Sequence, residues 1–210
     1  MATNLPNLLT YFRILLVPLV VIALYLEEDA GNWTALALFA IASITDWLDG
    51  YLARAWNQTS NLGRMLDPIA DKLLVAVVLL ALTWQGTIAG YSLWAAIIIL
   101  CREILVSGLR EYLAGLRVSV PVTQLAKWKT AIQMIALAFL LLGPAGDHIV
   151  PGITELGLAL LWAAAILTLY TGYDYFRAGL RHIDDTHPPE RPAGAPAPPD
   201  GSAANGDAAP

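Results

Sequence analysis

The chain has 210 residues, of which 57% are apolar and only 14% are charged, and its mean hydropathy is +0.59. These values exclude an ordinary soluble domain, in which about a quarter of the residues are charged, and they favour a membrane protein. Most of the formal net charge of −5 lies after residue 183, so the rest of the chain has no basic surface of the kind that nucleic acid requires.

Six apolar segments approach the length of about 20 residues that a helix needs to cross a bilayer. We therefore expect an all-α, polytopic membrane protein with six transmembrane helices. No basic leader precedes the first segment, so we expect that segment to stay in the protein as a membrane anchor. The expected spans are Leu8–Leu26, Trp33–Leu52, Pro68–Trp84, Leu93–Gly108, Trp128–Leu142 and Ile153–Tyr173.

The lysines and arginines between the spans predict the orientation of the chain. The connections at residues 27–32, 85–91 and 143–152 contain neither residue, whereas the other connections contain several. Because basic loops stay in the cytoplasm, and because the number of spans is even, we expect both termini to be cytoplasmic. Arg13 lies about one turn inside the first span, where it either snorkels to the surface, which is the simpler expectation, or serves a polar site.

The composition changes at residue 184. Seven of the thirteen prolines fall between residues 188 and 210, among Ala, Gly, Asp and Ser. Such a segment cannot bury a core. We therefore divide the chain into a membrane domain, residues 1–183, and a disordered Pro/Ala-rich cytoplasmic tail, residues 184–210.

Two pairs of aspartates flank the connection between the second and third spans. Asp46 and Asp49 are three residues apart and Asp67 and Asp71 are four apart, so each pair shares one face of a helix. Four ionised carboxylates next to apolar spans repel one another unless cations neutralise them. Carboxylate oxygens suit Mg²⁺ or Mn²⁺, and the only cysteine, Cys101, cannot build a thiolate site. We expect a divalent-metal site here; the alternative is a set of solvated interfacial acids or helix caps.

Small residues and an arginine accompany the first pair. Gly50 and Ala53 remove side-chain bulk beside the acids, and Arg54 can bind a phosphate with two hydrogen bonds. Taken alone, these residue types also fit helix packing and membrane topology. Their position next to the acids favours a phosphate-bearing ligand.

The stretch from Asp46 to Asp71 has the pattern D-x2-D-G-x2-A-R-x8-G-x3-D-x3-D and resembles the CDP-alcohol phosphotransferase family. The resemblance implies a six-helix, usually dimeric membrane enzyme in which a CDP-linked lipid loses CMP to an alcohol acceptor. It also implies two divalent ions held by all four aspartates, with Asp71 acting as the base as well. The residues implied to border the CDP group are Gly50, Ala53, Arg54, Ser60 and Gly63.

Basic residues also gather around the connection between the fourth and fifth spans. A phosphate-bearing acceptor requires a cationic clamp, whereas serine or an uncharged polyol does not. Topogenic or lipid-headgroup charges are the alternative interpretation. The candidates for binding the acceptor phosphate are Arg102, Arg110, Lys127 and Lys129.

The segments 4–13, 101–111 and 127–130 resemble one branch of the family, which transfers the phosphatidyl group of CDP-diacylglycerol to sn-glycerol 3-phosphate in phospholipid synthesis. On this basis Thr10 and Arg13 are further site candidates. Thr123 and Ala126 depart from the pattern of that branch, which has Ser and Gly at these positions. We expect a homodimer in the cell membrane of a bacterium, with the site facing the cytoplasm.

Two other functions stay open at this point. Cardiolipin synthases and inositol-phosphate transferases share the core signature, so the same transfer to another acceptor is one alternative. The other is a cation-coupled transporter, which also places carboxylates in a membrane domain. Transport sites usually lie near the midplane between repeats, whereas these acids lie near the cytoplasmic end. Release of CMP distinguishes the enzyme from the transporter.

Overall fold

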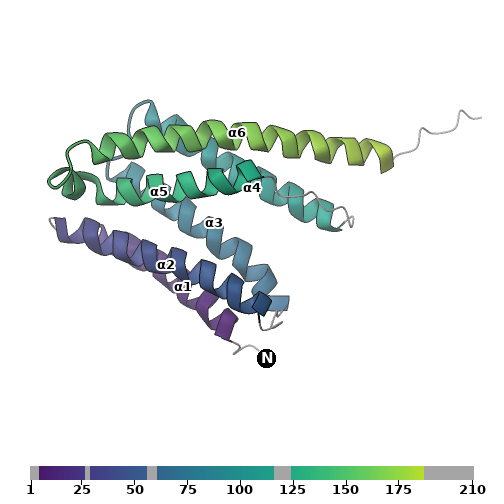
Figure 1. Ribbon diagram of the computed structural model, residues 1–210, viewed down its shortest axis with the longest axis horizontal. Coiled ribbons are helices and arrows are strands. Elements are labelled where there is room, and N and C mark those ends of the chain that lie inside the picture. The colour runs from purple at the N-terminus through teal and green to yellow at the C-terminus, as the bar shows by residue number, and fades with distance from the viewer. Residues whose placement is uncertain (1–4, 27–28, 56–60, 116–123, 187–210) are drawn as a thin grey trace, which may run out of the picture.

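The structure is a computed structural model that describes residues 5–26, 29–55, 61–115 and 124–186. Within these ranges the regular elements are all α-helices, which confirms the predicted all-α fold for this part of the chain (Figure 1). The helices are α1 Leu5–Ala23, α2 Asp29–Ala55, α3 Asn61–Trp84, α4 Ser92–Gly115, α5 Gln124–Asp147 and α6 Ile153–Thr186.

The helices form a bundle in which most of them follow one long direction (Figure 1). The closest partners are α5 and α6, while α1 packs on α2 and α3, and α4 packs on α6. Contacts between α2 and α5 join the two groups. The start of α1 and the end of α6 lie at the same end of the bundle, opposite the turn between α5 and α6 (Figure 1).

Four helices contain segments that are long and apolar enough to cross a membrane: Asp29–Leu52, Ser92–Gly115, Lys127–Asp147 and Ile153–Tyr173. They correspond to the second, fourth, fifth and sixth predicted spans. The apolar part of α1, Leu8–Ala23, is shorter. In α3 the first half contains Asp67, Asp71 and Lys72, which interrupt the apolar run. Crossing by α1 and α3 therefore stays a prediction.

Several helices extend beyond the apolar segments that predicted them. For example, α3 begins at Asn61, seven residues before the predicted span, and α6 continues to Thr186, three residues into the predicted tail. Hydropathy detects the part of a helix that suits lipid, whereas backbone hydrogen bonding continues into the polar flanks. The rest of the predicted tail lies outside the described residues.

Small residues allow the helices in the core to approach closely. A Cβ atom on Gly157 of α6 would lie 3.0 Å from Cγ and Cδ2 of Leu140 on α5. Many large apolar side chains are exposed on the surface of the bundle. This distribution is the one expected for helices that contact lipid. Fully buried core residues include Val20, Ala35, Val78, Leu82, Ile99, Ala136, Leu137, Leu161, Ala164 and Ala165.

A backbone break near the end of α5 explains where the fifth predicted span ends. Gly143 has φ 45° and ψ −133°, a conformation outside the helical region that glycine adopts readily, and Pro144 follows it. The side-chain amide of Asn32 in α2 donates a hydrogen bond of 2.7 Å to the carbonyl of Leu141, just before the break. The hydrogen bond from Asn32 thus connects α2 to α5 just before the break.

Candidate functional site

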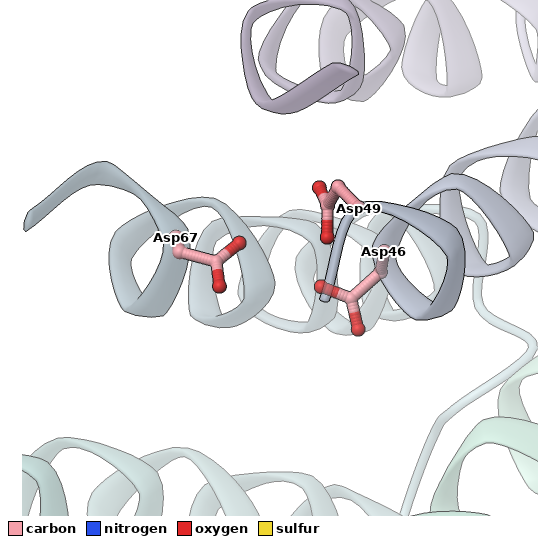
Figure 2. A group of neighbouring side chains, drawn as sticks. All are labelled: Asp46, Asp49 and Asp67. Carbon is pink, nitrogen blue, oxygen red and sulfur yellow. The ribbon is translucent and has the colours of Figure 1, made fainter. Parts of the chain in front are cut away.

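Three of the four predicted metal ligands form one cluster. Asp46 and Asp49 come from α2 and Asp67 comes from α3, and one carboxylate oxygen of each lies within 4.8 Å of the others. Figure 2 shows the carboxylate of Asp67 turned toward the pair on α2. The i, i+3 spacing places Asp46 and Asp49 on the same face of α2, as the sequence predicted. Because both α2 and α3 pack on α1, the first helix brings the acidic faces together.

Arg13 of α1 lies in the centre of this cluster. Its side chain is 0% exposed, and its two terminal nitrogens form ion pairs with Asp46 and Asp49. Nη1 also lies 3.3 Å from Oδ1 of Asp67. The expectation that Arg13 snorkels to the surface is therefore wrong. A buried guanidinium is stable where carboxylates neutralise its charge. Three carboxylates on α2 and α3 do so here, so the side chain does not have to reach the membrane surface.

The donor atoms of the cluster fit a divalent cation. Three carboxylates against one guanidinium leave a net negative charge when all are ionised. Asp49 is only 4% exposed, and its Oδ1 is a buried oxygen without a hydrogen-bond partner among the described atoms. Buried carboxylate oxygens of this kind are the ligands that Mg²⁺ and Mn²⁺ prefer.

Asp71 is electrostatically coupled both to this cluster and to a second group of charges. It is one turn after Asp67 on α3, and it interacts electrostatically with its neighbour Lys72 and with Asp46 and Arg13 of the cluster. It also interacts with Glu103 of α4 and Lys129 of α5. Its position suits a carboxylate that acts next to the metal ligands.

The second group contains two of the predicted acceptor-binding residues. Lys129, 3% exposed, forms an ion pair with Glu103, and Nη1 of Arg102 lies 3.4 Å from the same Glu103 oxygen. Nη2 of Arg102 donates a 3.3 Å hydrogen bond to Oγ1 of Thr171 on α6. These contacts connect α4, α5 and α6.

The other two predicted acceptor-binding residues, Arg110 and Lys127, have exposed side chains. Arg110 lines a cavity of about 640 Å³ between α3 and α4, together with Lys72 and Glu103. The structure therefore brings Arg102 and Lys129 to one carboxylate and places Arg110 on the wall of the adjacent cavity.

Four of the five residues predicted to border CDP occupy the ends of α2 and α3. Gly50 follows Asp49 directly, and Gly63 lies in the first turn of α3. The helix α2 includes Ala53 and Arg54, whose side chains are not among those described, and Ser60 lies outside the described residues. Thr10, the remaining candidate, is buried one turn before Arg13 on α1.

Sequence reasoning missed Glu103. The residue lies inside the fourth predicted span, and an ionisable residue within an apolar span is by itself a reason to look for a partner and a function. Because Arg102 precedes Glu103 directly, the sequence suggests only that these two neighbours pair with each other. The second partner of Glu103, Lys129, is 26 residues away in sequence, so only the folded chain shows this contact.

The chain is similar to a known protein family and to several named relatives. A family model described as CDP-alcohol phosphatidyltransferase matches residues 3–170. A relative from Rickettsia felis is 46% identical over 83% of this chain and 94% of its own length. Relatives from Cereibacter sphaeroides and Shigella flexneri are 40% and 42% identical over 87% and 88% of this chain, and over 98% and 100% of their own lengths. All three are named CDP-diacylglycerol–glycerol-3-phosphate 3-phosphatidyltransferase.

Proposed function

The chain belongs to the CDP-alcohol phosphatidyltransferase family, and from this membership we propose that it transfers the phosphatidyl group of CDP-diacylglycerol to sn-glycerol 3-phosphate. The products are phosphatidylglycerol phosphate and CMP. The names of the relatives, which align over nearly their whole length, carry the choice of donor and acceptor. The cluster of Asp46, Asp49 and Asp67 beside Asp71 supports the chemistry.

We assign the metal ligands to Asp46, Asp49, Asp67 and Asp71 and propose two ions of Mg²⁺ or Mn²⁺. When bound, the ions neutralise the pyrophosphate of the donor and the negative charge that CMP carries away. The buried Asp49 oxygen without a partner supports this assignment. Arg13 compensates part of the carboxylate charge and fixes the direction of the side chains on α2.

We assign the proton transfer to Asp71. The hydroxyl oxygen of glycerol 3-phosphate attacks the lipid-side phosphorus of the pyrophosphate, and its proton passes to the Asp71 carboxylate. A bond forms between the acceptor oxygen and this phosphorus, while the bond from the phosphorus to the oxygen of CMP breaks and CMP leaves with the electron pair. The step needs no covalent enzyme intermediate, so ping-pong kinetics would contradict it.

Binding of the two substrates divides between the two sides of Asp71. We propose that the CDP group binds along the ends of α2 and α3, where backbone without side-chain bulk adjoins the acids, and that the acceptor phosphate binds near α4 and α5. The assigned CDP-binding residues are Gly50, Ala53, Arg54, Ser60 and Gly63; the acceptor-binding residues are Arg102, Arg110, Lys127 and Lys129, with Thr10 as a further candidate.

We also propose that all six helices cross the cell membrane, that both termini face the cytoplasm and that the chain forms a homodimer. The four long apolar helices and the common end of α1 and α6 support the six-span topology. The absence of Lys and Arg from residues 27–32, 85–91 and 143–152 supports the orientation. Residues 1–183 form the catalytic membrane domain, followed by the tail.

The proposed function is tested by CMP release from the purified protein in mixed micelles with CDP-diacylglycerol and Mg²⁺. We expect release to require sn-glycerol 3-phosphate and to produce phosphatidylglycerol phosphate. Release with inositol phosphate or phosphatidylglycerol in its place would change the acceptor and keep the chemistry. No CMP release with any of these acceptors would contradict the proposal as a whole.

A further inference from the structure

Glu103 is a mostly buried carboxylate to which the proposed chemistry gives no role. It lies in the middle of α4, and its side chain is 16% exposed. A single oxygen, Oε1, contacts both Lys129 of α5 and Arg102 of α4. Burying a carboxylate in an apolar helix costs free energy unless cations pair with it. The two cations that pair with Glu103 therefore indicate what the residue does.

Lys129 depends on this carboxylate. An ammonium group that is 3% exposed requires an opposite charge, because desolvation otherwise favours the neutral amine or moves the side chain outward. The ammonium has three N–H donors, and the contact with Glu103 uses one of them. Glu103 therefore keeps Lys129 charged and in place while leaving it able to donate to a ligand.

The position of this pair relative to Asp71 suits the acceptor. Asp71 interacts electrostatically with both Glu103 and Lys129. In glycerol 3-phosphate only a three-carbon chain separates the reacting hydroxyl from the phosphate. When the hydroxyl lies at Asp71, the phosphate must contact one of the cations that act on the Asp71 charge, which are Lys72, Arg13 and Lys129. Three carboxylates already engage Arg13, and Lys129 is 3% exposed and held by Glu103.

Arg102 also holds Glu103. Its guanidinium bridges Glu103 and Thr171 of α6, and Thr171 is fixed by a 2.9 Å hydrogen bond that it donates to the carbonyl of Leu167. A Cβ atom on Gly172 would lie 3.2 Å from Cγ of Arg102, so glycine at this position gives the arginine its space. One oxygen of the carboxylate is thus held both by Arg102, which is hydrogen-bonded to α6, and by Lys129 of α5.

We propose that Glu103 is a positioning residue for the acceptor phosphate, which it serves by holding charged Lys129 beside Asp71. This inference rests on the proposed function and identifies Lys129 as the cation that contacts the phosphate of glycerol 3-phosphate. Arg102, which is assigned above to the acceptor phosphate, also holds the Glu103 carboxylate in place.

The test is a double-mutant cycle of Glu103→Gln and Lys129→Gln, in which the KM for each substrate is measured in mixed micelles. We expect either single substitution to raise the KM for sn-glycerol 3-phosphate about tenfold or more, the loss typical of one charge-assisted hydrogen bond. The KM for CDP-diacylglycerol is expected to change by less than about twofold. In the double variant the two effects are expected not to add, because Glu103 acts through Lys129.

Two controls complete the experiment. Glu155→Gln removes the same charge from the first turn of α6, at the opposite end of the bundle, and is expected to leave both KM values unchanged. Glu103→Asp keeps the charge on a shorter side chain and is expected to give an intermediate KM for the acceptor. It also carries the test if the Gln variant does not fold.

The outcomes separate this inference from the proposed function. A wild-type protein that releases no CMP with glycerol 3-phosphate would overturn both. Normal wild-type transfer with an unchanged acceptor KM in the Glu103 variants would overturn only the inference. The same holds for fully additive effects in the double variant, or for equal increases in both KM values, which would indicate a merely structural role.

Discussion

At the scale of single residues, the site consists of charges that compensate one another. Arg13 contacts three carboxylates from two helices, and Glu103 receives cations from α4 and α5. Asp71 interacts electrostatically with both groups. Asp71 thus interacts both with the proposed metal site, where the donor pyrophosphate binds, and with the proposed acceptor cation. A base that takes a proton from the acceptor hydroxyl must be near both substrates.

Asp71→Asn removes the proposed base and one metal ligand with little change in volume. We expect kcat for CMP release to fall by a factor of about 10² to 10⁴, the range typical of a lost general base. The measurement is steady-state CMP release at saturating substrates and Mg²⁺. Asp147→Asn, at the far end of α5, is a matched control that is expected to keep kcat. A kcat within twofold of wild type for the Asp71 variant would exclude the proposed base.

Arg13→Gln removes the cation from the acidic cluster. We expect the variant to lose about 3–5 kcal/mol of stability without divalent cations, because the carboxylates then repel one another without compensation. Saturating Mg²⁺ is expected to restore most of this loss. The measurement is the thermal unfolding temperature in detergent with EDTA and with Mg²⁺.

Arg13→Lys is the control for charge alone. It keeps one positive charge but lacks the planar group that reaches two carboxylates at once, so we expect an intermediate stability. If Arg13→Gln lost the same stability with EDTA and with Mg²⁺, the arginine would stabilise the fold without sharing the charge of the metal site.

At the scale of helices, packing and breaks determine how the charged residues are placed. The close contact of α5 and α6 requires the missing side chain at Gly157, and the break at Gly143 lets Asn32 join α2 to α5. The α5–α6 pair carries Lys129 and Thr171, which complete the charge group around Glu103. A change in helix packing far from the acids is therefore expected to affect the site.

Gly157→Leu tests the close contact between α5 and α6. A side chain at this position would overlap Leu140 and Phe139, and overpacking of this kind typically costs about 1–3 kcal/mol. We expect a lower unfolding temperature. Gly108→Leu in α4 is the control, because a Cβ atom there would meet no atom within 4 Å. Equal unfolding temperatures for the two variants would show that the contact at Gly157 is not tight.

At the scale of the whole molecule, the charge groups connect all six helices. Arg13 joins α1 to α2 and α3, and Glu103, Lys129 and Thr171 join α4, α5 and α6. Asp71 interacts electrostatically with members of both groups. Ligands that bind at this end are therefore expected to stabilise the whole bundle rather than a single helix.

Metal removal tests this expectation. We expect EDTA to abolish CMP release and to lower the unfolding temperature, and Mg²⁺ or Mn²⁺ to restore both. A cation at 100 times its dissociation constant would add about 2.7 kcal/mol to the stability of the folded state. Ca²⁺ favours more ligands at longer distances and is expected to restore activity less well. If EDTA changed neither the unfolding temperature nor the activity, the protein would not use a divalent metal at this site.

The sequence by itself determined the helical fold class, the approximate positions of the helices and the acids that form the cluster. These features depend on local patterns: apolar length predicts a span, and the i, i+3 spacing places Asp46 and Asp49 on one face. The fixed spacing from Asp46 to Asp71 also carried the family resemblance, which the family model confirms.

Only the tertiary structure decided which charges neutralise one another. Arg13 precedes Asp49 by 36 residues and Glu103 precedes Lys129 by 26, and no local period relates such positions. The sequence could place Arg13 inside a span but could not show whether its guanidinium would reach the surface or a partner. That choice depends on the packing of α2 and α3 against α1, because a buried charge is stable only where another helix brings the opposite charge to it.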